Sequence, residues 1–428
     1  MTKTHSQNVI VFIGGGIIGL STAYNLAKRH GTHIKIKIVE AFGKTFTAAS
    51  STCTGCINYG FTRDLVQLIG LGKYSFDLWA EEAQRSTASS NGFIQLTGYR
   101  PRSCFGIEPE GNGQGLDLLP DWVRRSSSWN VDDQVLGAHT AMVNPIGVGE
   151  WITKQCLDLG VEIQTGVQVV DITLSPENQV QAVTCVKKGT GGENCPSLTR
   201  IKCKQVVLAC GPWTPTLYRT LFPLSPIHLQ WNTDAGDWAE WENPCPTTQL
   251  TTAFVSFAHI IGEKLEFAAR NNGTIWACGR RNLTAPLPPT GQMDKPDPSL
   301  IQELNDRALE WINWGCRCKE TTHRQLQILS SGRAFRPASK TGLPIISEVP
   351  SPDLTGGGCS GDGSNQSGVF VCWGHGSYGL TLGMGSGKLM SQLMSREKTD
   401  IDLSLFTLGG SQSLHGDDGG NTGAPGKL

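Results

Sequence analysis

Hydrophobic and polar residues repeat with two different periods near the start of the chain. Residues 9–13 form a short β-branched run, and residues 34–39 alternate isoleucine with lysine, which is the period-two pattern of a strand. Between them, Leu20, Ala23 and Leu26 follow the spacing of an amphipathic helix. A strand, a glycine turn, a helix and a second strand within about thirty residues predict a βαβ unit.

The same patterns return in the middle of the chain. Residues 149–159 predict a helix, and residues 161–173 predict strand segments. Two further strand-like runs, 180–187 and 197–204, are separated by glycine-rich turn residues and predict a β-hairpin. Residues 206–209 then predict a short buried strand that ends at a Gly-Pro pair.

Two other segments differ in composition and predict a second domain. Residues 76–144 and 225–325 are richer in tryptophan and proline, with strand patterns, a hairpin turn at 271–273 and a long helix at 298–315. We therefore predict an α/β fold in which this β-rich (α+β) domain is inserted into a Rossmann-like domain. The Rossmann-like domain is then discontinuous and comprises residues 1–75, 145–224 and 326–407.

Three stretches lack a regular pattern. Residues 100–119 and 351–368 predict loops, and the second of them contains six glycines. Residues 408–428 are rich in glycine and polar residues and cannot bury much apolar surface, so we expect them to be disordered.

Charge and composition exclude several functions. Across 428 residues, 36 basic and 37 acidic side chains give a formal charge of −1. This balance offers no basic field to nucleic acid and no block of like charge to a membrane surface. No apolar run is long enough to span a bilayer, and 14 cysteines are too few for a disulfide scaffold in so long a chain. We expect a cytoplasmic protein; the final Gly426-Lys427-Leu428 loosely resembles the Ser-Lys-Leu address and leaves the peroxisome as the alternative.

The first glycine turn carries a dinucleotide-binding pattern. Gly14, Gly16 and Gly19 fit G-x-G-x-x-G directly after a strand and at the start of a helix. Gly14 permits the tight turn, Gly16 lets a pyrophosphate approach the helix N-terminus, and Gly19 lets helix and strand pack closely. Glu40 ends the next strand, where an acid accepts hydrogen bonds from ribose hydroxyls. An ordinary glycine turn is the alternative interpretation, but the strand, helix and acid in register favour a dinucleotide.

A second glycine-rich turn favours FAD over NAD as that dinucleotide. Residues 369–373 predict a buried strand, and residues 374–381 (Gly-His-Gly-Ser-Tyr-Gly-Leu-Thr) lead from it into a helix that contains Gly383, Gly385 and Gly387. The N-terminus of this helix can stabilise negative charge on a reduced flavin, which a nicotinamide does not require. A glycine-rich helix packed closely on a sheet is the structural alternative.

Further motifs accompany the two glycine turns in a set order. They are residues 206–214 (Val-Val-Leu-Ala-Cys-Gly-Pro-Trp-Thr), Arg336-Pro337 and residues 342–346 (Gly-Leu-Pro-Ile-Ile). Together these motifs resemble the D-amino-acid oxidase (DAO) family of FAD-dependent oxidoreductases, and their layout resembles that of its fungal members. The resemblance covers residues 8–406 and implies a Rossmann-like FAD-binding domain with an inserted substrate domain.

The resemblance also implies which residues contact FAD. They belong to the first glycine turn, the acid and the serines that follow the second strand, a backbone position near adenine, the Gly-Pro turn and the second glycine turn. The expected contacts are Gly14, Gly16, Ile17, Ile18, Gly19, Glu40, Ser50, Ser51, Val167, Gly211, Gly376, Ser377, Tyr378, Gly379, Leu380 and Thr381. The cysteine that links flavin covalently in some members has no recognisable counterpart here, so we expect non-covalent FAD.

Arg336 and Tyr378 are the expected substrate-binding residues. Arg336 falls where these oxidases place an arginine that binds a substrate carboxylate, because a guanidinium pairs bidentately with that group and orients the substrate Cα–H. An arginine paired within the core is the alternative, and Arg333 is close enough in sequence to be confused with it. His375 is a candidate base, but hydride transfer depends more on orientation than on a base, and we assign no catalytic residue.

Two features of the chain leave the family pattern or suggest other chemistry. Residues 49–55 (Ala-Ser-Ser-Thr-Cys-Thr-Gly) replace a Gly-rich stretch of the relatives, so contacts to the ribityl chain stay unassigned. The pairs Cys53/Cys56 and Cys316/Cys318 have no Cys/His partner pair nearby, so we expect no metal site.

We therefore predict an enzyme, an FAD-dependent oxidoreductase of the amine or amino-acid oxidase type. Its substrate is expected to be a small amine or amino acid, which loses hydride from the C–N carbon to flavin N5 and becomes an imine. Molecular oxygen is the expected electron acceptor. The alternatives are a tailoring oxidase that acts on a larger natural product, and a non-catalytic flavin-binding or trafficking protein.

Overall fold

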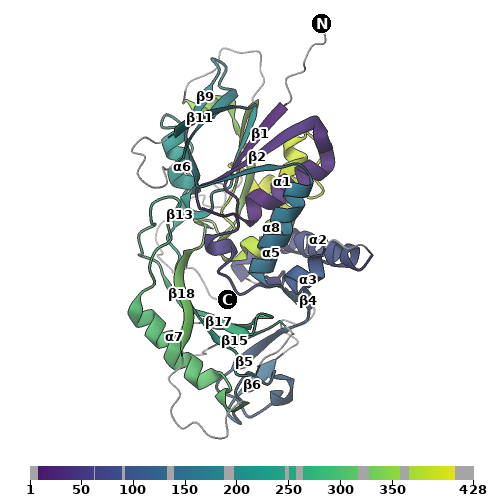
Figure 1. Ribbon diagram of the computed structural model, residues 1–428, viewed down its shortest axis with the longest axis vertical. Helices are drawn as coiled ribbons and strands as arrows, with labels where there is room; N and C mark the ends of the chain where they lie inside the picture. Colours follow the sequence, from purple (N-terminus) through teal and green to yellow (C-terminus); the bar gives the residue numbers. More distant parts are fainter. Residues whose placement is uncertain are drawn as a thin grey trace.

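Strands from the beginning, the middle and the end of the chain build one six-stranded sheet (Figure 1). A computed structural model describes residues 8–61, 63–88, 92–132, 139–187, 197–245, 250–256, 264–316, 327–356 and 366–409. The sheet order is β20-β21-β12-β1-β2-β8, and all neighbours are parallel except β20 and β21. Its strands are β1 (Asn8–Ile13), β2 (Ile34–Glu40), β8 (Glu162–Thr165), β12 (Gln205–Leu208), β20 (Ile345–Pro350) and β21 (Gln366–Trp373).

Both faces of this sheet are buried, because successive side chains of its strands alternate between two apolar cores. Ile10 and Phe12 of β1 belong to the core under the helices, whereas Val11 and Ile13 belong to the core on the other face. The helices on the first face are α1 (Ile17–His30), α2 (Ile69–Ala88), α3 (Phe93–Thr97), α5 (Pro145–Asp158) and α8 (Gly379–Met394). The second face is covered by α6 (Thr214–Leu221) and by the antiparallel sheet of β9 (Val167–Leu174), β10 (Val180–Lys187) and β11 (Ser197–Lys202).

A seven-stranded, mostly antiparallel sheet forms the opposite end of the elongated molecule (Figure 1). Its order is β18-β14-β17-β16-β15-β5-β6. The strands are β5 (Cys104–Glu108), β6 (Asn130–Asp132), β14 (Ala235–Glu242), β15 (Thr251–Ser256), β16 (Lys264–Ala269), β17 (Thr274–Asn282) and β18 (Ile328–Phe335). Helix α7 (Pro298–Trp311) packs on one face of the sheet through Leu304, Ala308 and Trp311. The other face is turned towards the first domain, where Cys278 and Trp276 pack near Cys56 and Met142.

Short strands and single turns join these layers. One small sheet consists of β3 (Cys56–Asn58), β7 (Thr140–Met142) and β4 (Arg100–Pro101), and another of β13 (Trp231–Asn232) and β19 (Ala338–Ser339). The 3-10 turns are η1 (Gly31–His33), η2 (Ala48–Ser50), η3 (Arg63–Leu68), η4 (Leu116–Leu118), η5 (Gly211–Trp213), η6 (Trp314–Cys316), η7 (Ser351–Leu354), η8 (Gly376–Tyr378) and η9 (Ser404–Phe406).

The α/β fold class and most of the expected elements are confirmed, with three corrections. The stretch 100–119 was expected to be a loop but contains β4 and β5, because β5 pairs in parallel with β15, which lies far away in sequence. The helix expected at 149–159 begins earlier, at Pro145, because the Asn144 side chain accepts hydrogen bonds from the backbone of the first turn. The helix expected at 298–315 ends at Trp311. The expected disorder of 408–428 concerns residues that, beyond 409, lie outside the described part of the chain, and the residue boundaries of the two domains stay a prediction.

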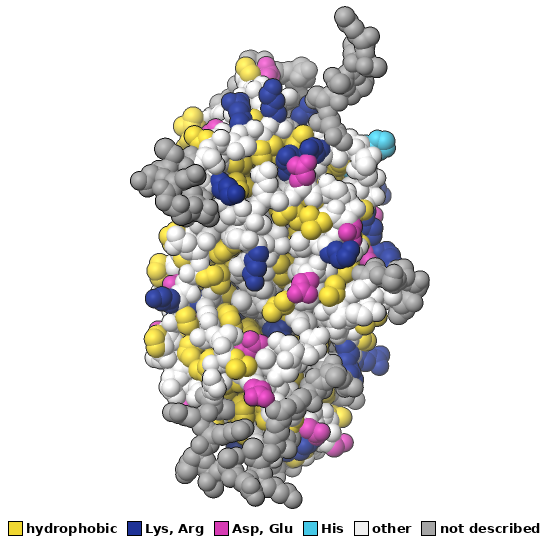
Figure 2. Space-filling view, in the orientation of Figure 1, with side chains coloured by type: hydrophobic (Ala, Val, Ile, Leu, Met, Phe, Trp, Pro, Cys, Tyr) yellow, Lys and Arg dark blue, Asp and Glu magenta, His cyan; other side chains and the backbone are white. Residues whose placement is uncertain are grey.

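The surface carries both signs of charge. Figure 2 shows basic and acidic side chains spread over the same face among apolar and neutral ones, in keeping with the balanced composition. None of the helices in the described residues combines the length and the apolar character that a bilayer crossing requires. Within the same residues, no three His, Cys, Asp or Glu side chains are grouped so that they could hold a metal ion.

Candidate flavin and substrate site

Helix α1 begins at a turn that accepts only glycine at two positions. Gly14 has a φ of +107°, and a Cβ added there would lie 2.4 Å from the Ala209 carbonyl oxygen. A Cβ on Gly19 would lie 2.0 Å from the Gly14 carbonyl oxygen, so strand and helix are packed as closely as backbone allows. Gly16 is the N-cap, and no acidic side chain occupies the first turn. The backbone N–H groups at this helix end therefore favour an anion.

Two side chains from neighbouring segments complete this turn. The Ser50 hydroxyl accepts a hydrogen bond from the Ile17 N–H at 3.1 Å. The Glu40 carboxylate accepts from the N–H groups of Gly15 at 2.6 Å and Phe42 at 2.8 Å. Burial raises the pKa of Glu40, and the backbone donors oppose that rise. Glu40 is thus fixed at the carboxyl end of β2, beside the helix N-terminus.

Val167, which is expected near adenine, and Gly211, a further expected FAD contact, lie at the same sheet edge. The Gly166 N–H donates to the Phe42 carbonyl oxygen at 2.7 Å, which brings the next residue, Val167, beside the loop after β2. Gly211 follows β12 with a φ of +56°, and a Cβ added to it would meet no atom within 4 Å. Parallel strands direct ligands to their carboxyl edge, and these residues lie along that edge.

The second glycine turn lies directly beside the first. A Cβ added to Gly379 would lie 3.9 Å from Cγ2 of Ile17, in the first turn of α1. Helices α1 and α8 then pack closely, because a Cβ on Gly383 would lie 2.6 Å from Ile17, and the Ser21 hydroxyl donates to the Gly383 carbonyl oxygen at 2.7 Å. Two turns from opposite ends of the sequence therefore present two helix N-termini to one edge of the sheet.

The turn before α8 is held from three sides. The Gly376 N–H donates to the Pro337 carbonyl oxygen at 2.9 Å, and the Asn58 N–H donates to the Thr381 hydroxyl at 3.2 Å. Tyr378 packs edge-on against Phe61 with ring centroids 4.9 Å apart. Burial raises the pKa of Tyr378 to about 12, so its phenol stays protonated near neutral pH.

The other residues expected in this turn differ in exposure. Leu380 is buried and its carbonyl oxygen accepts from the Trp79 indole N–H at 3.3 Å, whereas Ser377 is exposed. A Cβ on Gly376, whose φ is +55°, would meet no atom within 4 Å, so the backbone of the turn faces open space on that side. Ser51 follows η2, and its hydroxyl donates to the Ala48 carbonyl oxygen at 3.2 Å.

His375 lies beneath the turn. Its side chain is 2% exposed, and Nε2 lies 3.0 Å from the Ser386 hydroxyl of α8. Burial lowers the pKa of His375 to about 3, so the ring is neutral at physiological pH. This contact ties the turn to its own helix and gives His375 a positioning role.

The structure distinguishes Arg336 from Arg333. Arg333 pairs with both carboxylate oxygens of Asp237, at 2.8 and 2.9 Å, and with Asp294 at 3.1 Å. Arg336 lies on the side of the second sheet that faces the first domain, where its Nη1 is 3.0 Å from Asp234 and its Nη2 is 3.5 Å from the Cys278 sulfur. Arg336 is thus partly paired within the core, as the alternative interpretation held, but it also lies beside the turn before α8.

Two carboxylates near Arg336 were not foreseen. Asp234 is 1% exposed and pairs with both Arg336 and Arg281, whose Nε lies 2.9 Å from it. Glu266 accepts a hydrogen bond from the Thr54 hydroxyl. The alternation of Leu265, Glu266 and Phe267 in a strand already places Glu266 on the face opposite to the apolar core, and this signal could have identified it.

The two cysteines of the pair Cys53/Cys56 make separate contacts. Cys56 faces Cys104 of β5, with sulfur atoms 3.5 Å apart, whereas the Cys53 thiol is directed at the Ser50 carbonyl oxygen. Cys318 lies outside the described residues, so the second cysteine pair is not placed.

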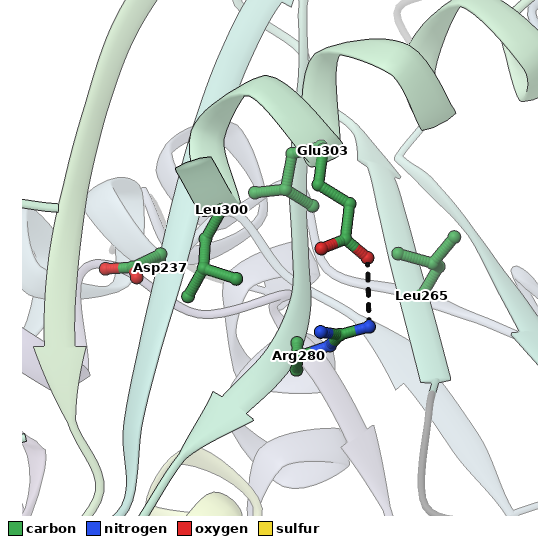
Figure 3. Close-up of a pocket in the computed structure, with 6 residues that line it drawn as sticks. Asp237, Leu265, Arg280, Leu300 and Glu303 are labelled. Carbon is green, nitrogen blue, oxygen red and sulfur yellow. Dashed lines mark ion pairs between the residues drawn. The ribbon is translucent and has the colours of Figure 1, made fainter. Parts of the chain in front are cut away.

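A small pocket under α7 lies on the opposite face of the second sheet. Figure 3 shows its lining, with an ion pair of 3.5 Å between Arg280 and Glu303. Its volume of about 10 Å³ is room for one water molecule, so it cannot hold a substrate.

The residues at the sheet edge fit FAD. Gly16 has no side chain at the N-cap of α1, so this helix end can face a pyrophosphate, with the Ser50 hydroxyl at the Ile17 N–H beside it. Glu40 lies where ribose hydroxyls would be bound, and the open side of Gly376 leaves room for a planar ring at the second turn. Fold and site together define a Rossmann-like flavoprotein with a β-rich second domain.

Comparison with known proteins gives the family. The family described as FAD dependent oxidoreductase (DAO) matches residues 9–393, and the chain belongs to it. The protein is therefore an FAD-dependent oxidoreductase with FAD as cofactor, and non-covalent binding is the family's usual mode.

The similar proteins agree with this assignment over nearly their full length. A Schizosaccharomyces pombe protein named "Putative oxidoreductase" is 23% identical and covers 91% of this chain and 94% of its own. Glycine oxidase of Geobacillus kaustophilus is 21% identical, with coverage of 95% and 97%. The crystal structure of that glycine oxidase has a TM-score of 0.65 at 18% identity and covers 94% of this chain and 99% of its own.

Proposed function

We propose that this protein oxidises the C–N bond of a small amine or amino acid to an imine, with molecular oxygen as electron acceptor. The observation that carries the proposal is the hydrogen bond of 2.9 Å between the Gly376 N–H and the Pro337 carbonyl oxygen. It joins the turn expected under the flavin to the residue directly after Arg336, and so couples a cofactor site to a substrate-binding cation. The bound flavin would supply the two-electron chemistry, and the protein would supply position and electrostatics.

The first domain would hold FAD through the residues along the sheet edge. The N–H groups at the start of α1 would bind the pyrophosphate, with the Ser50 hydroxyl beside them, and Glu40 would accept hydrogen bonds from the ribose. The backbone of Val167 would lie near adenine, and Gly211 would be a further FAD contact. The turn of residues 376–381 would lie under the pyrimidine ring, where the N-terminus of α8 favours negative charge.

The second sheet would hold the substrate. Arg336 has five N–H donors, of which Asp234 and Cys278 engage a part, so the guanidinium can also bind a carboxylate. Asp234 fixes the guanidinium in place, since it is itself buried and held by Arg281. The protonated Tyr378 hydroxyl would donate a second hydrogen bond.

The names of similar structures support amines and amino acids as the substrate class. They include an iminodiacetate oxidase of Chelativorans, an L-proline dehydrogenase of P. horikoshii and an L-amino acid deaminase of Proteus vulgaris. These activities belong to those proteins, and what they share is oxidation of an amine or amino acid.

Anaerobic mixing of the purified holoprotein with a panel of amines and amino acids tests the proposal. We expect at least one compound to bleach the flavin absorbance band, and we expect admission of air to restore the band with formation of hydrogen peroxide. Full FAD occupancy without bleaching by any compound would favour the non-catalytic alternative. Bleaching that air does not reverse would refute oxygen as the acceptor.

A further inference from the structure

Glu266 is a carboxylate of the substrate face that the proposed reaction does not use. Its strand β16 lies between β15 and β17, and Glu266 is directly opposite Phe254 on one side and Cys278 on the other. Both neighbours belong to the cluster of side chains that faces the first domain, whereas Leu265 and Phe267 belong to the core under α7. Glu266 therefore points towards the face where the substrate is expected.

The position of Glu266 is fixed by the loop that follows the first flavin contacts. The Thr54 hydroxyl donates to Oε2 of Glu266, and Thr54 lies four residues after Ser50, whose hydroxyl accepts from the start of α1. On the other side, Cys278 lies between Glu266 and the guanidinium of Arg336, which is 3.5 Å from the Cys278 sulfur. The carboxylate thus lies at the junction of the flavin domain and the substrate sheet.

The negative charge of Glu266 affects the pKa values of other side chains at this junction. After burial, the carboxylate of Glu266 is the next cause that raises the pKa of Tyr378, while Arg281 lowers it. Glu266 also contributes to the raised pKa of Cys278, for which burial is again the first cause. The groups that its charge affects thus include Tyr378 and Arg336, the two residues expected to bind the substrate.

Among the described residues, no cation lies within ion-pair distance of Glu266, although its charge helps to raise the pKa of Arg336. Thr54 is the one hydrogen-bond partner of its carboxylate among the described residues, and it binds only Oε2. The nearby cations are engaged elsewhere: Arg336 and Arg281 share Asp234, and Arg270 donates to the Cys53 carbonyl oxygen and lies over the Trp276 ring. A half-buried carboxylate with a free oxygen is a site for a cation or a strong donor.

Resting on the proposed amine oxidation, we propose that Glu266 binds a second, positively charged nitrogen of the substrate, one that is not oxidised. The nitrogen at the reacting carbon must be unprotonated, because its lone pair becomes the new C=N bond as hydride leaves. An adjacent carboxylate stabilises the protonated form of an amine, so Glu266 would hinder the reacting nitrogen and suits a spectator ammonium. The substrate is accordingly a diamine or a basic amino acid rather than an acidic or purely aliphatic one.

Matched ligand pairs test this inference on the holoprotein. Lysine and norleucine (both enantiomers of each), and 1,5-diaminopentane and hexylamine, differ within each pair mainly in a terminal ammonium. Dissociation constants come from the change in flavin absorbance on anaerobic titration, and kcat/KM comes from oxygen uptake. We expect the ammonium-bearing member of a pair to bind about 10- to 100-fold more tightly, which is the range of a charge-assisted hydrogen bond.

Substitutions test whether Glu266 is the group responsible for the preference for the ammonium-bearing ligands. In Glu266→Gln the preference for the ammonium should fall to within about threefold, and Glu266→Asp should restore part of it. Glu303→Gln, which makes the same change in the ion pair under α7, should keep the full preference. FAD content and the thermal unfolding midpoint of each variant verify that it is folded.

Several results would overturn the inference. They are equal binding within both pairs, a preference that survives Glu266→Gln, an equal loss for both members of a pair in that variant, and absence of binding by all of these ligands. If other amines, without a second cation, still bleach the flavin, the proposed function stands and only the role of Glu266 falls. If no amine does so, both fall.

Discussion

At the scale of single residues, Arg333 and Arg336 have different ion-pair partners, which indicates a structural role for Arg333 and a substrate-binding role for Arg336. Asp237 is 3% exposed, and Arg333 is its ion-pair partner among the described residues. Asp234 is equally buried but is shared by Arg336 and Arg281. Removal of Arg333 therefore leaves a buried carboxylate without a counter-charge, whereas removal of Arg336 does not.

We predict that Arg333→Ala and Arg336→Ala have different effects. Arg333→Ala should lower the free energy of unfolding by about 3–5 kcal/mol, because breaking a buried ion pair leaves an uncompensated charge. Arg336→Ala should lower it less and should reduce kcat/KM for a carboxylate-bearing substrate by about 10- to 100-fold. Urea unfolding and steady-state kinetics measure the two effects. Unchanged turnover of such a substrate by Arg336→Ala would remove Arg336 from the substrate site.

The lowered pKa of the buried His375 leads us to predict that the free energy of unfolding depends on pH. Its ordinary pKa of 6.5 falls to about 3 in the folded chain because the ring is buried. Between these values the unfolded chain binds a proton at His375 that the folded chain does not bind, so stability decreases as the pH is lowered through this window. Between pH 7 and pH 5.5 the loss from this one residue is about 1 kcal/mol.

Urea unfolding of the wild type and of His375→Gln at these two pH values checks the prediction. Glutamine can still form a hydrogen bond with Ser386 but does not titrate, so the variant should lose about 1 kcal/mol less on acidification. His33→Gln, a change at an exposed site, should behave as the wild type does. Identical losses in the wild type and in His375→Gln would contradict the assignment.

At the scale of elements, the contact between α1 and α8 aligns the two glycine turns. A Cβ added to Gly387 would lie 2.5 Å from the Ser21 hydroxyl and 2.7 Å from the Thr22 backbone nitrogen. Backbone atoms cannot move aside as a flexible side chain can, so larger residues at this position would push the helices apart. The glycines of α8 thus set the distance between two helix N-termini that would bind one cofactor.

We predict that Gly387→Ala destabilises the protein by about 1–3 kcal/mol and weakens FAD binding, because the helices must separate. The matched control is Gly70→Ala in α2, where an added Cβ meets no atom within 4 Å. That change should stabilise the helix by about 0.5–1 kcal/mol. Thermal unfolding and FAD titration of both variants give the comparison, and equal effects at the two positions would refute this role of Gly387.

At the scale of the whole molecule, FAD would link segments from the beginning, the middle and the end of the chain. The expected contacts lie after β1, β2, β8, β12 and β21, and these five strands are adjacent to one another in one sheet. A ligand that binds only the folded chain stabilises it by mass action. Stability should therefore depend strongly on the cofactor.

We predict that FAD at 100 times its dissociation constant stabilises the FAD-depleted protein by about 2.7 kcal/mol, which corresponds to a rise of several degrees in the unfolding midpoint. Glu40→Gln should weaken FAD binding about tenfold through the loss of charge-assisted hydrogen bonds and reduce this rise at equal FAD concentration. Glu162→Gln, on the exposed edge of the same sheet, is the control. Differential scanning fluorimetry measures the midpoints, and an absent shift with FAD would contradict the cofactor site.

Features that depend on neighbouring residues could be predicted from the amino-acid pattern. The strand, glycine turn and helix around Gly14, and the acid at Glu40, follow from local periodicity and from backbone conformations that only glycine adopts easily. Contacts between groups far apart in the chain could be seen only in the folded protein. In the fold, β5 pairs with β15, Asp234 forms an ion pair with Arg336, and Asp237 forms one with Arg333. One carboxylate oxygen of Glu266 accepts a hydrogen bond from Thr54, and the other has no partner among the described residues. These contacts are set by the register of the strands and by the packing of the two domains against each other. Both depend on segments that are far apart in the chain.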